Sequence, residues 1–107
     1  MKHVISNNLP IESIKTLHTL KGISPQNCVT ECIALLADQD ALILIESGVN
    51  NLLIPEFIDA IKDKNIGCFV LDEDANARNV SHEHFKPIDF ATWIDISANS
   101  NLILNWF

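Results

Sequence analysis

The chain has 107 residues, 48% of them hydrophobic, and its fourteen acidic and seven basic side chains give a formal net charge of −7. This length fits one domain with a core of its own; no apolar run reaches the ~18 residues of a membrane span, and the N-terminus lacks the apolar stretch of a signal peptide. We therefore expect a cytoplasmic protein. Nucleic-acid binding depends on Lys and Arg at phosphates, so a chain with one arginine, Arg78, is not expected to bind nucleic acid directly.

An N-terminal extension precedes an alternation of strands and helices. Residues 1–16 carry no clear apolar period, and we assign a single domain to residues 17–107. Residues 16–20 predict the first strand. Ser24 and Pro25 then predict a helix start, because Ser is a favoured N-cap and Pro a favoured first helical residue.

The middle of the chain predicts two more strands, each followed by a helix. Residues 41–45 are apolar on both sides, which is typical of a central parallel strand with helices on both faces. The helix after them is expected to run to about Lys64, with Pro55 in its first turn. Residues 66–71 predict the third strand, and three consecutive acids, residues 72–74, open a short helix.

The last part of the chain predicts an edge strand, a helix and a final strand. Pro87 places residues 85–88 at an edge or a strand end. Asp89 is the expected N-cap of a helix over residues 89–98, and residues 101–107 predict the fifth strand. The inward face of this helix is expected to consist of Phe90, Trp93, Ile94 and Ser97. Five short strands alternating with helices predict a three-layer α/β/α sandwich, flavodoxin-like, with a mostly parallel sheet.

Three cysteines are the first candidates for chemistry. Cys28 and Cys32 lie four residues apart, so they share one face of the first helix. Two interpretations stay open: small core residues, or a thiolate activated by the helix dipole. Cys28 lies nearer the helix start, where the dipole acts more strongly. Cys68 stands inside the third strand and is expected to be a core residue.

The acidic segment and a pair of histidines are the other candidates. Residues 72–74 are interpreted as a capped turn with an acidic rim, in preference to a metal cluster, and Asp74 has the spacing of an i,i+4 ion pair with Arg78. Zinc needs three or four ligands, so we interpret His82 and His84 as part of a solvated loop and expect no metal. The chain has no dinucleotide or phosphate-loop motif, so no cofactor is expected.

Several short motifs, in order along residues 17–107, resemble the DsrH/TusB family of sulfur-relay subunits. The motifs are Leu17-His18-Thr19-Leu20, Ser24-Pro25, Cys32-Ile33, Ser47-Gly48-Val49, Leu71-Asp72-Glu73-Asp74, Ala77-Arg78, Pro87-Ile88-Asp89-Phe90 and Trp106. Two features depart from the family. Ser47 stands where an aspartate often precedes the glycine, and residues 1–16 have no counterpart.

The resemblance implies a DsrEFH-like fold and a non-catalytic or accessory subunit of a persulfide-transfer complex. TusB-like proteins assemble with TusC-like and TusD-like (DsrF/DsrE-like) partners into a heterohexamer. That complex relays sulfur toward 2-thiolation of the tRNA wobble uridine, so the link to tRNA is indirect; the DsrH branch serves an analogous complex in sulfur oxidation. The principal carrier thiol belongs to the TusD/DsrE-type subunit. Cys32 falls where many DsrH-like members have a cysteine, which makes it the candidate persulfide thiol of this chain.

Without a covalent part, the role of the chain would be architectural. The expected contact surfaces are then the acidic rim at residues 72–74 and the stretch 102–107, where Trp106 and Phe107 suit an interface anchor. Two rivals from other classes remain: a homo-oligomeric scaffold without sulfur chemistry, and a stand-alone enzyme that binds a small anion or nucleotide.

Overall fold

The computed structural model describes residues 14–24 and 27–107, and most of the predicted extension, residues 1–13, lies outside them. The strands are β1 (Thr16–Leu20), β2 (Ala41–Leu44), β3 (Gly67–Leu71), β4 (Lys86–Ile88) and β5 (Leu102–Trp106). The helices are α1 (Asn27–Leu35), the 3-10 helix η2 (Glu46–Leu53), α2 (Pro55–Ile61), α3 (Asp72–Ala77) and α4 (Phe90–Asn99). The predicted alternation of strands and helices is confirmed.

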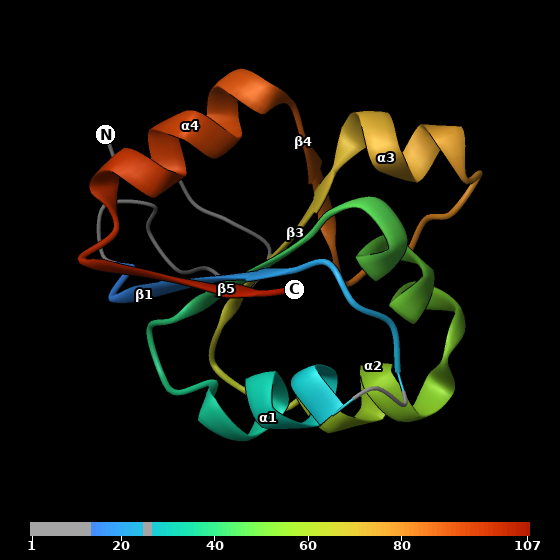
Figure 1. Ribbon diagram of the computed structural model, residues 1–107, viewed down its shortest axis with the longest axis horizontal. Helices are drawn as coiled ribbons and strands as arrows, with labels where there is room; N and C mark the ends of the chain where they lie inside the picture. Colours follow the sequence, from blue (N-terminus) through green and yellow to red (C-terminus); the bar gives the residue numbers. More distant parts are fainter. Residues whose placement is uncertain (1–13, 25–26) are drawn as a thin grey trace.

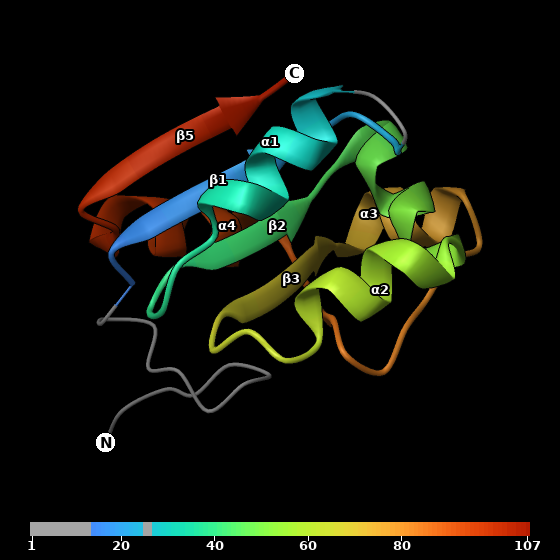
Figure 2. The ribbon, with the colours of Figure 1, turned by 90° about the horizontal axis from the view of Figure 1, so that it is seen from below.

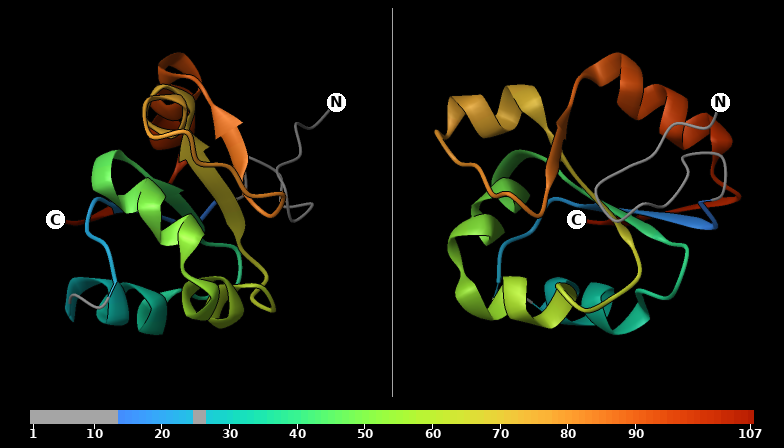
Figure 3. Two further views of the ribbon diagram at one scale, coloured as in Figure 1. Left: turned by 90° about the vertical axis from the view of Figure 1, so that its right-hand side faces the viewer. Right: turned by 180° about the vertical axis from the view of Figure 1, so that it is seen from behind.

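The five strands form one parallel sheet with the order β4-β3-β2-β1-β5. Helices α1 and α2 cover one face of this sheet and α4 covers the other (Figures 1 and 3). The predicted three-layer sandwich is therefore confirmed. The sheet order places β4 and β5 at the two edges, and β5 lies beside β1 as the outermost strand (Figure 2).

The core consists of two clusters, one on each face of the sheet. Alternation along β2 explains this division, because successive side chains of a strand point to opposite faces. Leu42 and Leu44 pack in the cluster under α1 and α2, whereas Ala41 and Ile43 pack in the cluster under α4. Ile14, just before β1, is buried in the second cluster as well.

The segment after β2 contains an element that the sequence analysis did not predict. A 3-10 helix, η2, begins at Glu46. The α-helix α2 starts at Pro55, which occupies its first turn as predicted, and ends at Ile61, before the expected Lys64. Glu46 has a φ of 49°, a left-handed conformation that is uncommon outside glycine. This sharp change of direction turns the chain from β2 into η2 without a loop.

Helix α4 starts as predicted but presents a different face to the sheet. Asp89 is its N-cap and accepts a hydrogen bond of 2.8 Å from the Thr92 N–H; hydrogen bonds from Thr92 also hold the pKa of Asp89 below its ordinary value. The prediction of an inward position is confirmed for Trp93, which packs against the core. It is wrong for Phe90 and Ile94, which are 54% and 56% exposed, while Ile96 is 1% exposed. The helix carries apolar residues on two sides, so periodicity could not tell which one meets the sheet.

The described helices are short. None of them has the length and apolar content needed to cross a bilayer. The predicted start of α1 at Ser24 and Pro25 is only partly covered, because residues 25–26 lie outside the described part of the chain.

Candidate functional site

Cys32, the candidate persulfide thiol, lies inside the core beneath α1. Its side chain is fully buried in the cluster that also contains Leu20 and Leu44. Burial, with a smaller contribution from the neighbouring Cys28, raises the pKa of the Cys32 thiol from 9.0 to about 12. Because the thiolate is the nucleophile in sulfur exchange, a thiol with this pKa is protonated and unreactive at neutral pH. The geometry therefore favours the core interpretation of Cys32.

The other two cysteines differ from each other in exposure. Cys68 in β3 is fully buried, as expected from the sequence, and burial raises the pKa of its thiol to about 12. Cys28, in the first turn of α1, is partly exposed and packs at the border of the same core. Of the three cysteines, Cys28 is the one that is not fully buried.

The raised pKa values of the two buried thiols predict a loss of stability in alkali. Cys32 and Cys68 keep their protons up to a pKa of about 12 in the folded chain, whereas the unfolded chain releases them near 9.0. The unfolded state thus binds fewer protons above this pH, and stability falls as pH rises, by about 1.4 kcal/mol per pH unit for each thiol. Urea unfolding on both sides of this range measures the slope.

The control for this prediction is a chain with Cys32→Ala and Cys68→Ala together. Its stability should fall less steeply between neutral and alkaline pH, because the two titrating thiols are gone. An unchanged slope in this variant would show that other groups cause the alkaline loss.

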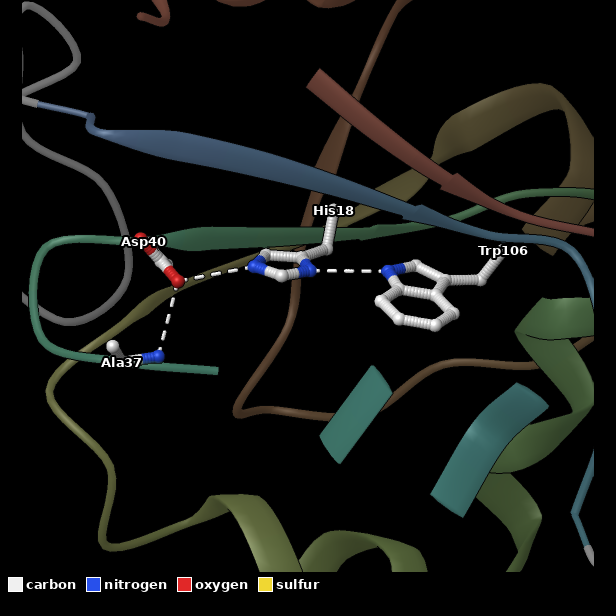
Figure 4. A network of polar contacts seen from close by, with 4 residues as sticks. All are labelled: His18, Ala37, Asp40 and Trp106. Atoms are coloured by element: carbon white, nitrogen blue, oxygen red, sulfur yellow. Dashed lines mark hydrogen bonds and ion pairs between the residues drawn. The ribbon is translucent and has the colours of Figure 1, made fainter. Parts of the chain in front are cut away.

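The side chain of a buried histidine connects β1 with the residue just before β2 and with β5 (Figure 4). His18 in β1 is 1% exposed. Its Nε2 lies 3.0 Å from Oδ2 of Asp40, and its Nδ1 accepts a hydrogen bond of 3.1 Å from the Trp106 indole Nε1–H. The same Asp40 oxygen also accepts the Ala37 N–H at 3.0 Å. The contacts join the residue just before β2, the middle of β1 and the end of β5.

The partners of His18 determine its tautomer. The indole N–H of Trp106 is a donor only, so Nδ1 of His18 must be the acceptor and the ring proton lies on Nε2, facing the Asp40 carboxylate. The two rings also stack, with centroids 6.2 Å apart and planes 11° from parallel. His18 and Trp106 both belong to the motifs that carry the family resemblance, but their contact over 88 residues was not predicted.

Asn51 is a second buried polar residue that sequence reasoning missed. It is 0% exposed, its Oδ1 accepts the Ser24 N–H at 2.8 Å, and its Nδ2 donates to the carbonyls of Gly22 and Gly48 at 2.8 and 2.9 Å. It thereby fastens the loop after β1 to η2. The feature of the sequence that could have indicated this role is an asparagine on an otherwise apolar helix face.

Gly48 lies where η2 closely approaches the end of β1. A Cβ on Gly48 would lie 2.2 Å from the carbonyl oxygen of Leu20, so the residue must be glycine for η2 to pass so close to the end of β1. The Ser47-Gly48 turn that resembles the family motif thus has a steric reason at its glycine, while Ser47 is exposed.

The acidic segment opens α3 at the carboxyl end of the sheet, but not as predicted in detail. The N-cap is Leu71, without a side-chain cap, so the acids occupy the first turn. Oδ2 of Asp74 accepts the Glu46 N–H at 2.7 Å. The ion pairs found among residues 14–24 and 27–107 do not include Asp74 with Arg78. This prediction is wrong because Asp74 turns toward the neighbouring η2.

The histidine loop lies beside a hollow of about 620 Å³ between α3 and β4. His82 lines this hollow, and its Nδ1 accepts the His84 N–H at 3.0 Å. Burial, with the nearby His82, lowers the pKa of His84. In the part of the chain that the structure describes, no three His, Cys, Asp or Glu residues come together as metal ligands would.

Comparisons with known proteins agree with this arrangement. The model of the family described as DsrH like protein matches residues 23–102. The crystal structure of the ychN protein from E. coli is similar with a TM-score of 0.69 and 13% identity, over 86% of this chain and 98% of that one. The solution NMR structure of Tm0979 from Thermotoga maritima has a TM-score of 0.57 and 20% identity, over 78% and 91%. No curated protein matches the chain.

The parallel sheet between α1 and α4, together with these structures, defines a small α/β protein with the flavodoxin-like fold expected from the sequence. The match over residues 23–102 goes further: the chain belongs to the DsrH-like family. The resemblance that the motifs indicated is confirmed, and it gives the general class of the protein as a sulfur-relay subunit.

Proposed function

We propose that this chain is a TusB-like subunit that assembles in the cytoplasm with TusC-like and TusD-like subunits into a heterohexamer. The complex would relay a persulfide sulfur toward 2-thiolation of the tRNA wobble uridine. Family membership supports the sulfur relay. The burial of Cys32 supports an architectural role for this subunit within it.

The chemistry of persulfide exchange explains why burial matters. An acceptor thiolate attacks the outer sulfur of the donor persulfide, the S–S bond of the donor breaks, and the donor leaves as a thiolate while a new persulfide forms on the acceptor. Cys32 offers a protonated thiol without access to a donor. We therefore propose that sulfur passes between the other subunits and that this chain holds them in place.

The outer side of α4 is the surface that we assign to a partner subunit. Phe90, Trp93, Ile94 and Ser97 line a shallow hollow of about 240 Å³, and the rings of Phe90 and Trp93 meet edge to face at 5.5 Å. Asp95 is the single charged residue of the helix. In this aromatic and aliphatic stripe Phe90 and Ile94 are exposed, while Trp93 is partly buried against the core. A stripe with so little charge is typical of the centre of a protein interface. Asp74 of the acidic rim instead accepts a hydrogen bond from the Glu46 N–H of the same chain.

Adding a charge to this stripe should prevent assembly. Ile94→Glu places a carboxylate at an apolar contact, and we expect the affinity for the partner subunits to fall at least ~30-fold, the effect of losing about 2 kcal/mol at an interface hot spot. Ile94 is 56% exposed, so the thermal stability of the isolated chain should not change. Native mass spectrometry of the co-expressed subunits measures the assembly.

The matched control is Ala91→Glu, which adds the same charge at an exposed position of the same helix outside the stripe. This variant should assemble like the wild type. If the wild-type chain forms no complex with TusC-like and TusD-like subunits, the proposed function is wrong; if both variants assemble equally well, only the assignment of the surface fails.

A further inference from the structure

The two edges of the sheet differ in how well they are protected against pairing with a strand of another molecule. The edge strand β4 has only three residues, and Lys86 and Pro87 are both exposed on it. A short edge with lysine and proline is a common protection against unwanted strand pairing. The edge strand β5 has five residues, Leu102 to Trp106, with neither a charge nor a proline, and it lacks these protections.

The backbone of β5 has hydrogen-bonding groups that point away from the sheet. The Leu102 N–H donates to the Lys15 carbonyl at 3.0 Å, and the Trp106 carbonyl accepts the Lys21 N–H at 3.1 Å. The backbone N–H and C=O groups of the even-numbered residues of β5 therefore point toward β1. Because backbone groups alternate along a strand, the N–H and C=O groups of Ile103 and Asn105 point outward, and β1 is the one described strand that pairs with β5.

We propose that the β5 edge binds a second copy of this chain, with the two β5 strands antiparallel about a two-fold axis at Leu104. Ile103 of each copy then exchanges two hydrogen bonds with Asn105 of the other, and the two Leu104 residues form the intervening non-hydrogen-bonded pair. This register satisfies every outward backbone group of residues 103 and 105. An isologous contact of this kind closes on itself as a dimer.

The side chains of β5 suit this self-pairing. Trp106 packs on the core cluster under α1. On this face Leu102 of one copy would lie opposite Trp106 of the other, so a row of apolar residues would form across the axis. Leu102 and Ile103 are 53% and 43% exposed in the single chain and would lose exposure on pairing. The hydrogen bond from Trp106 to His18 fixes the indole in place, which lowers the entropy lost on association.

Charge favours the same place for a second copy. The chain has a net charge of −7, but no charged side chain follows Asp95 in the sequence. Two copies that meet at β5 therefore bring no charged side chains of this segment together. Two copies that met at the acidic end of the sheet would instead repel each other. Since five residues per strand form less than a standard interface, we expect dissociation in about the micromolar range.

Sedimentation of the isolated full-length chain over a series of concentrations tests the proposal. The wild type should shift from monomer to dimer as concentration rises, and Asn105→Pro should remain a monomer, because proline removes an outward N–H while leaving the bonds to β1 intact. Pro87→Ala, at the protected edge, should dimerise like the wild type. A wild type that stays monomeric, or an Asn105→Pro variant that dimerises equally, would overturn the proposal.

Cysteine cross-linking tests the register even if Asn105→Pro does not fold. Leu104→Cys should form an intermolecular disulfide on mild oxidation, because facing residues of a non-hydrogen-bonded pair lie about 4.5 Å apart between Cα atoms, within the range of a disulfide. Ile103→Cys faces position 105 of the other copy and should cross-link far more slowly. Equal rates for the two variants would contradict the two-fold axis at Leu104. These outcomes do not depend on the sulfur-relay function.

Discussion

His18→Ala is expected to lower the free energy of unfolding by about 3 kcal/mol or more, because two polar groups lose a hydrogen-bond partner, at about 1–3 kcal/mol for each buried group and more for a charged one. His18 is the side-chain partner of the Asp40 carboxylate, and it also accepts the indole N–H of Trp106. Both groups would lose this partner in a site where His18 and Asp40 are almost fully buried. Urea unfolding followed by far-ultraviolet circular dichroism measures the loss.

The double variant His18→Ala with Asp40→Ala separates the pair from simple loss of packing. If the pair is the cause, removing Asp40 as well should restore part of the stability, so the double variant should be more stable than the sum of the two single changes predicts. Additive losses would show that the two residues stabilise the fold independently.

Trp106 gives a second readout of this network. In a Trp93→Phe background, Trp106 is the remaining tryptophan. His18→Ala should shift its fluorescence emission to the red, since the indole is no longer held against β1 and the end of β5 is freer to move into water. An unchanged emission spectrum would mean that β5 keeps its position without His18.

Asn51→Ala is the second change with a large expected effect, about 3 kcal/mol or more. The Ser24 N–H and the carbonyls of Gly22 and Gly48 all bond to the Asn51 amide. A buried polar group that loses its partner costs about 1–3 kcal/mol; the bond to Gly48 is buried, and those to Ser24 and Gly22 are partly buried. Thermal and urea unfolding measure the total effect, and hydrogen exchange at the Ser24 amide reports the loosening of the loop after β1.

Asn51→Asp is the matched comparison. An aspartate keeps the oxygen that accepts the Ser24 N–H but turns a carboxylate toward two carbonyls, so the exchange rate at Ser24 should change less than in Asn51→Ala while global stability still falls. Ser47→Ala, at an exposed position of the same helix, should change neither. Unaltered protection of Ser24 in Asn51→Ala would contradict the fastening role.

The elements that were predicted correctly have local causes. The fully apolar residues 41–45 indicated a central strand covered on both faces, Pro87 indicated an edge, and Asp89 indicated a helix start. In each case the residue itself restricts the backbone or its surroundings.

The features that were missed depend on which distant parts of the chain meet. The two apolar sides of α4 look alike in the sequence, and only the position of Ile96 over the sheet makes Phe90 an outer residue. His18 and Trp106 are 88 residues apart, so no local pattern joins them. Cys32 shows the same limit, because spacing placed it on a helix face without telling whether that face was open.

The 2-thiouridine content of tRNA, measured by mass spectrometry in the host strain lacking this chain, tests the central claim most directly. We expect the modification to fall in that strain and to recover equally with the wild type, Cys32→Ala and Cys68→Ala. Cys68→Ala is the control for the loss of a buried thiol, since both cysteines are fully buried. Undiminished 2-thiouridine without the chain, or recovery with Cys68→Ala but not with Cys32→Ala, would contradict an architectural subunit of the thiolation relay.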